Sequence, residues 1–591
     1  MQSASHMATP ITDLAQEWLR LDKDASTRDE IYKLLVQGDH AELERRLRTR
    51  IAFGTAGLRG SMQAGFSRMN ALTVVQASQG LAAYLLRTQA NVERRGVVVG
   101  RDARHNSAKF ASHAAAVFVA RGIKVWWYEV PVHTPLVPFG VLELGAAAGV
   151  MITASHNPAQ DNGYKVYWEN GCQIIPPHDA GIAAAILQNL EPATWDTSVV
   201  DDGHLLVEGS LGLVRDAYFR AVSAVAHVPG AAGPSPRDDR FVYTPMHGVG
   251  LPYMSAAMRD LGLADAMVVV AAQAEPDPSF PTVRFPNPEE RGALALAVRT
   301  ADAHGIALVL ATDPDADRLA VAEKAGGAWR QLSGNQLGAL LASHVLATYP
   351  ADRPRAKLAM LASTVSSRML AAMAAAEGFH YAETLTGFKW LGNAAADLEG
   401  RGYDVRFAFE EALGYMVPRV VRDKDAVAAA ALFMAAAARW RRDEGLSAWA
   451  KLAQLHDRYG WHEDANTYVV SPSPAATDRV FDDIRRLRQP YPATLGGRRI
   501  LSWRDLTVGY DSATADHVPE LPVSGESQMI TCEVEGDVRV TVRGSGTEPK
   551  IKLYVEGRGR SSAEARRGAD EVLADLVAEW FRLEEYGLRM A

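Results

Sequence analysis

Cysteine is nearly absent from this chain. Its 591 residues include only two cysteines, Cys172 and Cys532, which lie far apart in the sequence. This excludes a disulfide framework and a cysteine-based zinc site. A low cysteine content also fits a reducing compartment, so we expect a cytoplasmic protein.

Long apolar runs and an excess of basic charge are also lacking. The charge-free apolar stretch at residues 426–438 is shorter than the roughly 20 residues that a membrane-spanning helix needs, and it predicts a buried helix. The formal net charge of −8 gives no general basic field for nucleic acid. The first residues, MQSASHMATP, lack the pattern of a signal peptide. We therefore expect no membrane and no nucleic acid as partner.

What the chain does contain is α/β alternation. Residues 97–100 predict a strand, residues 109–121 an Ala-rich helix and residues 124–130 a second strand, which together form a βαβ unit. Helical spacing at residues 11–51 precedes this unit. Similar α/β stretches follow at residues 241–250, 306–323, 357–363 and 403–415. From about Trp461 strands and helices mix, and an amphipathic helix is predicted at residues 563–583.

Three aspartates alternate directly after a predicted buried strand. Asp313, Asp315 and Asp317 offer the oxygen ligands and negative charge that hard divalent cations prefer, at a strand end where α/β sheets bind ligands. A calcium EF-hand would need Gly and Glu where this chain has Arg318 and Lys324. We therefore predict Mg²⁺, with Arg318 as an ion-pair partner or a phosphate ligand. A solvated turn is the alternative.

Another apolar run ends on a serine beside a histidine. The stretch GVMITASHNPAQDNGYKVY, residues 149–167, places Ser155 after a short strand. It lacks the G-x-S-x-G elbow of a hydrolase, and the adjacent side chains of Ser155 and His156 diverge in extended chain. We predict that Ser155 carries a phosphoryl group, with Lys165 nearby to transfer a proton or neutralise charge. The alternatives are a cap or turn role for Ser155 and a surface position for Lys165.

Four further loops carry groups suited to a phosphorylated sugar. RGSGTEPK, starting at Arg543, joins two alternating strands and combines an arginine fork with glycines and hydroxyls, which favours phosphate over a plain hairpin. FEEALGY places Glu410 and Glu411 at a strand end, where they can accept hydrogen bonds from sugar hydroxyls; a surface pair of glutamates is the alternative. FGTAGLRG and TLTGFKW are Gly loops with one cation each, Arg59 and Lys389.

In this order, the motifs FGTAGLRG, TASHNP, DPDADR, TLTGFKW, FEEALGY and RGSGTEPK resemble the α-D-phosphohexomutase superfamily across most of the chain. The resemblance implies an α/β fold of three related mixed α/β domains plus a C-terminal α+β phosphate-binding domain around a central cleft. The predicted domains are 1–208 with the phosphoserine loop, 209–329 with the Mg²⁺ loop, 330–459 with the sugar loop, and 460–591.

The same resemblance implies the site residues. Ser155 would be the phosphorylated serine and would bind Mg²⁺ together with Asp313, Asp315 and Asp317. Lys165 is the first candidate for proton transfer. The predicted catalytic residues are Ser155, His156, Lys165, Arg59, Arg318 and Lys389. The predicted substrate-binding residues are Glu410, Glu411, Thr386, Gly387, Arg543, Ser545, Gly546 and Thr547.

One departure affects the sugar loop. Many members carry Glu-x-Ser-Gly-His there, whereas this chain has Tyr415 in place of the histidine. The variant resembles the phosphoglucomutase-2/phosphopentomutase-like branch and related bacterial phosphomannomutase-like proteins.

The implied function is a phosphosugar mutase that interconverts hexose 1-phosphate and hexose 6-phosphate, of glucose or mannose. It would work through a phosphoserine and a sugar bisphosphate, with an activator of the glucose 1,6-bisphosphate type. A phosphopentomutase, a sugar-bisphosphate synthase, a metal-dependent sugar phosphatase and a non-catalytic sugar-phosphate binding protein stay open.

Overall fold

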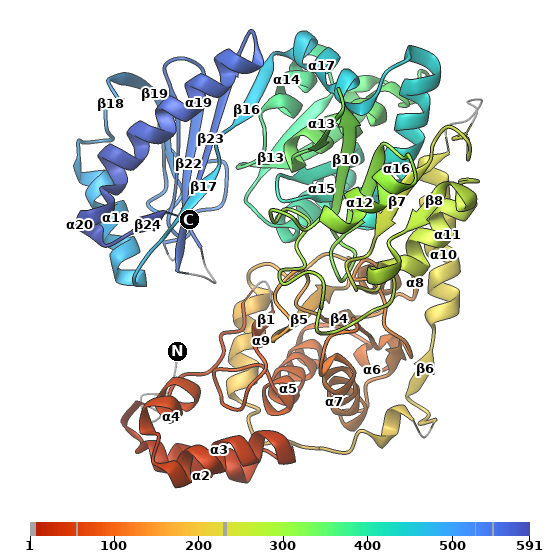
Figure 1. The fold of residues 1–591 in the computed structure, drawn as a ribbon. Coiled ribbons are helices and arrows are strands. Elements are labelled where there is room, and N and C mark those ends of the chain that lie inside the picture. Colours follow the sequence, from red (N-terminus) through yellow and green to blue (C-terminus); the bar gives the residue numbers. More distant parts are fainter. Residues whose placement is uncertain are drawn as a thin grey trace. The chain divides into compact units, whose positions relative to one another are not determined.

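The computed structural model describes residues 7–54, 57–201, 203–227, 233–525, 527–545 and 549–590. Its internal contacts divide the chain into two compact units. The first unit combines Met1–Arg353 with Gly387–Ala448, and the second combines Pro354–Thr386 with Trp449–Ala591. Figure 1 colours the elements of both units along the chain.

Three helices open the first unit and confirm the helical spacing at residues 11–51. They are α2 (Ile11–Leu21), α3 (Ala25–Gln37) and α4 (His40–Leu47). Their apolar faces share a small core with Phe66, whose ring meets that of Trp18 edge-on at 5.1 Å between centroids.

A six-stranded mixed sheet follows. Its order is β1-β5-β4-β2-β3-β6, in which β2 pairs parallel with β3 and β4, and β5 pairs antiparallel with β4 and β1. The strands are β1 (Leu58–Ser61), β2 (Val97–Arg101), β3 (Val125–Trp127), β4 (Ala148–Ile152), β5 (Asp161–Trp168) and β6 (Val207–Gly209). The predicted βαβ unit is confirmed as β2, helix α7 (Ser107–Ala120) and β3.

Helices cover both faces of this sheet. Strand side chains alternate between the faces, so Val97 and Val99 enter a core with α7, whereas Gly100 turns to the opposite face. There a side chain at Gly100 or Gly149 would lie within 2.7 Å of valines on helix α8 (Leu136–Glu143), so glycine lets this helix pack closely. The helices of this region are α5 (Ala71–Thr88), α6 (Val92–Arg95), α7, α8 (Leu136–Glu143), α9 (His178–Leu187) and α10 (Leu211–Ala226).

The second sheet has the order β11-β10-β9-β7-β8. Strand β7 pairs parallel with β8 and β9, and β10 pairs antiparallel with β9 and β11. The strands are β7 (Phe241–Thr244), β8 (Met267–Val269), β9 (Leu308–Thr312), β10 (Leu319–Ala325) and β11 (Ala328–Gln331), with helices α11 (Gly250–Asp260) and α12 (Ala295–Ala303). Strand β9 is buried along its whole length, so the sequence after it leaves the sheet inside the protein.

The remaining elements of the first unit surround a short antiparallel pair, β14 (Asp404–Glu410) and β15 (Gly414–Met416). Helices α13 (Gly334–Ala347), α15 (Phe388–Gly400) and α16 (Ala426–Arg439) accompany it, and a π-helical turn, Trp440–Glu444, follows α16. The predicted buried helix at residues 426–438 is confirmed as α16. Asp425 caps it by accepting hydrogen bonds from the N–H groups of Val427 and Ala428.

The second unit joins a parallel strand pair to a large antiparallel sheet. The pair is β12 (Leu358–Ser363) and β13 (His380–Thr384), connected by α14 (Met369–Glu377). The sheet runs β18-β19-β21-β22-β23-β17-β24, and β16 and β20 pair with β23 and β19. Its strands are β16 (Trp461–Asp464), β17 (Thr467–Val470), β18 (Thr494–Leu495), β19 (Arg498–Asp505), β20 (Tyr510–Asp511), β21 (Met529–Val534), β22 (Val538–Gly544), β23 (Lys550–Gly559) and β24 (Arg589–Met590).

The long helix predicted at residues 563–583 is interrupted. Helix α19 (Ser562–Leu576) passes into a π-helical turn, Val577–Phe581, and Arg582 then adopts a left-handed φ of 33° before α20 (Leu583–Tyr586). The apolar pattern continues through the break because Trp580 and Phe581 stay buried in the same core. The other helices of this unit are α17 (Ala448–Tyr459) and α18 (Pro474–Arg486).

A partly buried ion-pair group, here called the Arg368 cluster, ties the β12–β13 segment to the antiparallel sheet. It consists of Arg368, Glu533, Asp537 and Glu556. The Arg368 guanidinium lies 2.9 Å from Glu556, 3.0 Å from Glu533 and 2.9 Å from Asp537. The second unit is therefore held together by charge pairing as well as by its apolar core.

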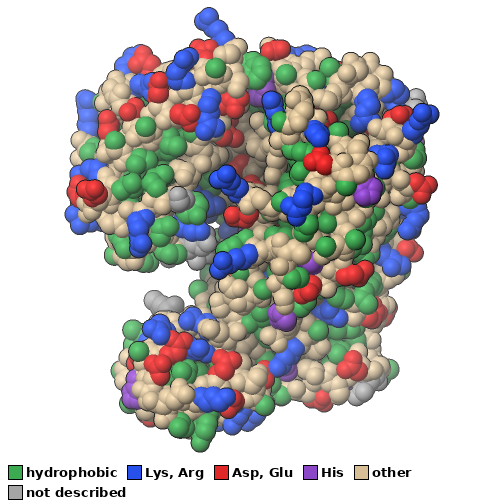
Figure 2. Space-filling view, in the orientation of Figure 1, with side chains coloured by type: hydrophobic (Ala, Val, Ile, Leu, Met, Phe, Trp, Pro, Cys, Tyr) green, Lys and Arg blue, Asp and Glu red, His purple; other side chains and the backbone are tan. Residues whose placement is uncertain are grey.

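The predicted fold class, three mixed α/β regions followed by a C-terminal region of strands and helices, is confirmed. The four predicted domain boundaries stay predictions. Among the described residues, no helix combines the length and apolar character that crossing a membrane requires. On the face drawn in Figure 2, basic and acidic side chains are interspersed.

Candidate active site

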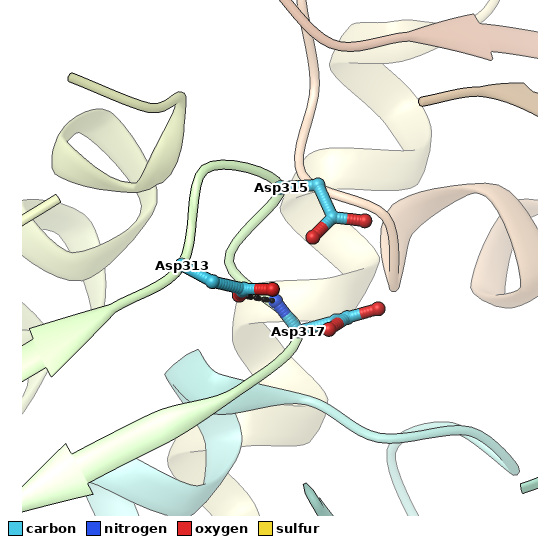
Figure 3. A group of neighbouring side chains, drawn as sticks. All are labelled: Asp313, Asp315 and Asp317. Atoms are coloured by element: carbon cyan, nitrogen blue, oxygen red, sulfur yellow. Dashed lines mark hydrogen bonds between the residues drawn. The ribbon is translucent and has the colours of Figure 1, made fainter. Parts of the chain in front are cut away.

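The three predicted aspartates lie together on the loop between β9 and β10 (Figure 3). All three side chains are fully buried, and each offers a carboxylate oxygen within 4.8 Å of the others. The loop is tight because Ala316 has a φ of 50° and because Asp313 Oδ1 accepts hydrogen bonds from the N–H groups of Asp317, at 3.1 Å, and Arg318, at 3.0 Å. The turn is thus closed by hydrogen bonds to the carboxylate of Asp313, and the carboxylates of Asp315 and Asp317 are presented on one side of the loop.

The donor set fits a divalent cation. Asp315 Oδ1 and Asp317 Oδ1 are buried and accept no hydrogen bond from the residues that the structure describes. Buried oxygens without a donor are costly unless something else neutralises them, and carboxylate oxygens are the preferred ligands of Mg²⁺. Burial and the two neighbouring carboxylates also raise the pKa of Asp313 well above its usual value.

Ser155 reaches this loop from the other sheet of the first unit. It follows β4, is buried, and has a φ of 54°, which a non-glycine residue rarely adopts. Its hydroxyl donates a hydrogen bond to Asp313 Oδ2 at 2.9 Å. Two loops that are 158 residues apart in sequence therefore bring the predicted phosphoryl carrier against the predicted metal ligands.

Two other predicted residues of this loop region lie close to Ser155. The Nδ1 atom of His156 lies 3.4 Å from the Ser155 hydroxyl. Burial, Arg318 and Arg59 lower the pKa of His156, so its ring is neutral at physiological pH. Arg59, on β1, donates to the side-chain oxygen of Asn157 at 3.2 Å.

Lys165 lies beside the aspartates and not on the surface. From β5 its ammonium group contacts Asp315 at 2.9 Å and Asp317 at 3.0 Å. Burial alone would lower the pKa of Lys165, but these two charges outweigh it and the pKa is raised. Lys165 therefore stays protonated and neutralises charge at the loop.

Arg318 connects the aspartate loop to the predicted sugar loop. Its guanidinium donates to the backbone oxygen of Ala412 at 2.6 Å and lies 4.0 Å from Asp313 and 3.9 Å from Asp317. The backbone N–H of Leu319 also donates to the oxygen of Leu413. The DPDADR and FEEALGY motifs are thus neighbours.

Glu410, at the end of β14, faces the start of α15. It accepts a hydrogen bond from the N–H of Gly387 at 2.6 Å, and Gly387 has a φ of 114°, which favours glycine at this position. Burial and the neighbouring Glu411 raise the pKa of Glu410 to about 7. Lys389 lies two residues after Gly387 on α15, so the part of the TLTGFKW motif that starts at Gly387 meets Glu410 in the first unit.

Tyr415 stands where many members of the superfamily that the chain resembles carry a histidine. Its side chain is fully buried, and its hydroxyl donates to the backbone oxygen of Gly334 at 3.4 Å. Burial raises its pKa well above the usual value, so it stays protonated. Tyr415 is a packing residue in this structure.

The remaining predicted substrate residues lie in the second unit. Arg543 lies near the end of β22, and Ser545 starts the connection to β23, where its N–H donates to the oxygen of Lys550 at 2.8 Å. The two flanking strands pair in antiparallel register, as their alternation predicts. Thr386 is the last residue of the segment that starts at Pro354. Gly546 and Thr547 lie outside the described residues.

Four domain models of one family match the chain in order. They are the phosphoglucomutase/phosphomannomutase alpha/beta/alpha domains I, II and III, at residues 50–193, 216–327 and 333–456, and the C-terminal domain, at residues 522–575. The chain belongs to the phosphoglucomutase/phosphomannomutase family.

Relatives within this family match over almost the whole chain. The "Probable phosphoribomutase" of Schizosaccharomyces pombe is 48% identical, with 98% of this chain and 99% of the relative covered. The human "Glucose 1,6-bisphosphate synthase" is 40% identical, with 93% and 90% covered. A solved phosphoglucomutase/phosphomannomutase family protein from Burkholderia thailandensis, 18% identical, shares the fold with a TM-score of 0.63 over 90% of this chain and 98% of that one.

The predicted superfamily and its phosphoglucomutase-2/phosphopentomutase-like branch are therefore confirmed. As a member of the phosphoglucomutase/phosphomannomutase family the protein is an enzyme, an intramolecular phosphotransferase acting as a mutase.

Three residues around this phosphomutase site were missed by the sequence analysis. Lys424, just before α16, contacts Asp317 at 2.6 Å. Thr134, just before α8, donates to Asp315 Oδ2 at 2.6 Å. Arg104 donates to the backbone oxygens of Ser155, at 2.5 Å, and Asn157, at 2.6 Å, and so fixes the serine loop. Arg104 and Lys424 stand in the charged loops RDARHNS and RDKDAV after secondary-structure elements, a signal that could have identified them, whereas nothing local marks Thr134.

Proposed function

We propose that the protein is a phosphosugar mutase that carries the phosphoryl group on Ser155 and prefers pentose 1- and 5-phosphates. The observation that carries the phosphoryl role is the 2.9 Å hydrogen bond from the Ser155 hydroxyl to Asp313 within a buried carboxylate group. The relative named a phosphoribomutase, 48% identical over nearly the full length, supports the pentose. The cytoplasm is the proposed location.

The chain's own residues supply most of what phosphoryl transfer needs, because this chemistry depends on positioning and charge neutralisation. Arg104 fixes the backbone of the serine loop. Lys165 and Lys424 hold Asp315 and Asp317 in place from two sides. His156, beside the serine oxygen, is a candidate to take a proton from the attacking sugar hydroxyl.

Asp313, Asp315 and Asp317, together with Ser155, would hold Mg²⁺. A bound Mg²⁺ supplies positive charge that stabilises a phosphoryl group in transfer. Arg318 lies next to the same carboxylates and would add a fixed cation there.

We assign the binding of the sugar, and of the phosphate that is not reacting, to the other loops. Glu410, Glu411, Thr386 and Gly387 would contact the sugar hydroxyls. Arg543, Ser545, Gly546 and Thr547 would hold the phosphate that is not reacting. In this scheme the phosphoryl group passes from Ser155 to the free hydroxyl, a sugar bisphosphate forms, and its other phosphate returns to Ser155. A sugar bisphosphate of the glucose 1,6-bisphosphate type would then act as activator.

Hexose phosphates are the second candidate substrates, and a bisphosphate synthase activity is the third. The human relative named a glucose 1,6-bisphosphate synthase, 40% identical, favours keeping both. Their shared requirement is the same phosphoserine, so the serine assignment does not separate them.

A substrate panel tests the sugar. Turnover of ribose 1-phosphate, glucose 1-phosphate, mannose 1-phosphate and glucosamine 1-phosphate is measured with Mg²⁺ and catalytic sugar bisphosphate. We expect the highest kcat/KM for ribose 1-phosphate, because the pentose is the proposed substrate. A higher kcat/KM for a hexose phosphate would overturn the pentose assignment, and release of inorganic phosphate in place of isomer would overturn the mutase.

A further inference from the structure

A groove of about 960 Å³ opens between helices α10 and α11 of the first unit. Figure 1 shows the two helices next to each other. None of the predicted site residues lines it. Its floor is aromatic, because the rings of Phe219 and Tyr253 stack with 6.4 Å between centroids and an interplanar angle of 28°. A volume of this size is typical of sites for small molecules and cofactors.

The walls of this α10/α11 groove carry arginines. Arg215 and Arg220 come from α10 and Arg259 from α11, and all three are exposed. No described residue forms an ion pair or hydrogen bond with their guanidinium groups. This contrasts with a chain whose formal net charge is −8 and whose other arginines mostly pair with carboxylates. Three arginines around one groove, none paired with a residue that the structure describes, favour an anionic ligand.

Acidic groups stand beside them. Asp216 and Asp260 also line the groove, and His227 lies at its end on the α10 side. Carboxylates near a phosphate-binding arginine can accept hydrogen bonds from ribose hydroxyls. A ligand with a planar ring, a polyhydroxylated middle and a phosphate end would therefore find a partner for each of its parts.

The floor of the groove contacts the segment that holds the aspartate loop. The ring of Tyr253 packs against that of His133 with 3.9 Å between centroids. The next residue, Thr134, donates both its backbone N–H, at 2.9 Å, and its hydroxyl, at 2.6 Å, to Asp315. A ligand that moves Tyr253 would therefore act on a residue that positions a proposed metal ligand.

We propose that the α10/α11 groove is a regulatory nucleotide-binding site: its aromatic floor stacks the base, its arginines bind the phosphates, and occupancy alters the affinity of the aspartate loop for Mg²⁺. The proposal is independent of which sugar the mutase prefers.

The first experiment measures binding of ADP to the full chain by calorimetry, with free Mg²⁺ held constant. The R215A/R220A double variant should bind ADP at least about tenfold more weakly, because it removes two charge-assisted contacts. Arg299→Ala is the matched control, since Arg299 is an exposed arginine on α12 of the same region. It should bind as the unchanged chain does, and neither variant should lose basal mutase turnover.

Three results would overturn the nucleotide assignment. One is no ADP binding, or equal binding by the double variant. Another is displacement of ADP by glucose 1,6-bisphosphate, which would place ADP in the candidate active site. The third is binding of inorganic pyrophosphate as tightly as ADP, which would reduce the groove to a plain anion patch. Weaker binding of both pyrophosphate and adenosine supports the assignment.

The second experiment measures the Mg²⁺ concentration for half-maximal turnover with and without saturating ADP, using buffered free Mg²⁺. We expect a shift of about fivefold or more in the unchanged chain and in Arg299→Ala, and no shift in R215A/R220A. An unchanged Mg²⁺ midpoint in the presence of bound ADP would overturn the regulatory role.

Discussion

Two charge clusters in this protein look alike at first and differ in how their acids and cations are arranged. In the Arg368 cluster of the second unit, one guanidinium reaches three carboxylates within 3.0 Å. Around the aspartate loop of the first unit, Lys165 and Lys424 reach Asp315 and Asp317, yet one buried oxygen on each of these aspartates has no donor among the described residues. A spare oxygen alone does not separate the two clusters, because Glu556 Oε1 is also buried without a donor among the described residues. Their arrangement does: acids gathered around one guanidinium are typical of a structural link, whereas three carboxylates within 4.8 Å of one another indicate a site for a ligand.

The largest expected effect is a loss of turnover without a loss of folding stability. Ser155→Ala removes the proposed phosphoryl carrier, so turnover should fall by a factor on the order of 10³ or more while the urea midpoint stays near that of the unchanged chain. Ser210→Ala, a buried serine at the start of α10, is the control and should keep turnover. Normal turnover of Ser155→Ala would remove the phosphoserine from the mechanism.

The second prediction tests whether the spare oxygens bind metal. Asp315→Asn removes negative charge from the proposed donor set, so Mn²⁺, used as a paramagnetic probe, should bind at least about tenfold more weakly. The Mg²⁺ midpoint for turnover should rise in parallel. Asp302→Asn alters an exposed aspartate that pairs with Lys324 and should change neither value. Unaltered Mn²⁺ binding by Asp315→Asn would make the aspartate loop structural, like the Arg368 cluster.

The third prediction tests the structural cluster. Arg368→Ala leaves buried Glu556 without its cation, which should lower the free energy of unfolding by about 3 kcal/mol in urea denaturation. The exposed pair of Arg566 and Asp570 provides the comparison, and Arg566→Ala should cost no more than about 0.5 kcal/mol. A loss for Arg368→Ala as small as that of the control would mean that the cluster adds nothing to stability.

The smallest expected effect concerns Asp537, which is compared with Glu556 within the Arg368 cluster. Asp537 is about half exposed, so solvent screens its pair with Arg368. Asp537→Asn should therefore lower the free energy of unfolding by less than about 1 kcal/mol, and Glu556→Gln should lower it by more. Equal losses of unfolding free energy in the two variants would show that the contribution of each carboxylate does not depend on its burial.

The sequence predicted those parts of the candidate site whose residues lie within one short stretch of the chain. Asp313, Asp315 and Asp317 alternate along one short loop and follow a continuous apolar strand, so both the loop and its chemistry can be predicted from one short stretch of sequence. Ser155 follows another such strand. Lys424 and Thr134 could not be found in this way, because they reach the same loop across 107 and 181 residues of sequence. Only the packing of the first unit brings them there.

The ends of helices were also hard to predict from local sequence patterns. The apolar pattern at residues 563–583 is helical throughout, but it does not reveal that Arg582 breaks the backbone while Trp580 and Phe581 keep their burial. Periodicity reports which face is buried and not whether every residue keeps helical hydrogen bonds. The replacement of a histidine by Tyr415 was visible in the sequence, but its burial required the fold.

The division of the chain has a consequence for anyone who wants to isolate the C-terminal region. A fragment cut at residue 460 would carry Glu533 and Glu556 but would leave Arg368 behind, together with β12 and β13. Such a fragment should express poorly or aggregate, whereas grafting residues 354–386 onto it through a short linker should restore a stable, autonomously folding module.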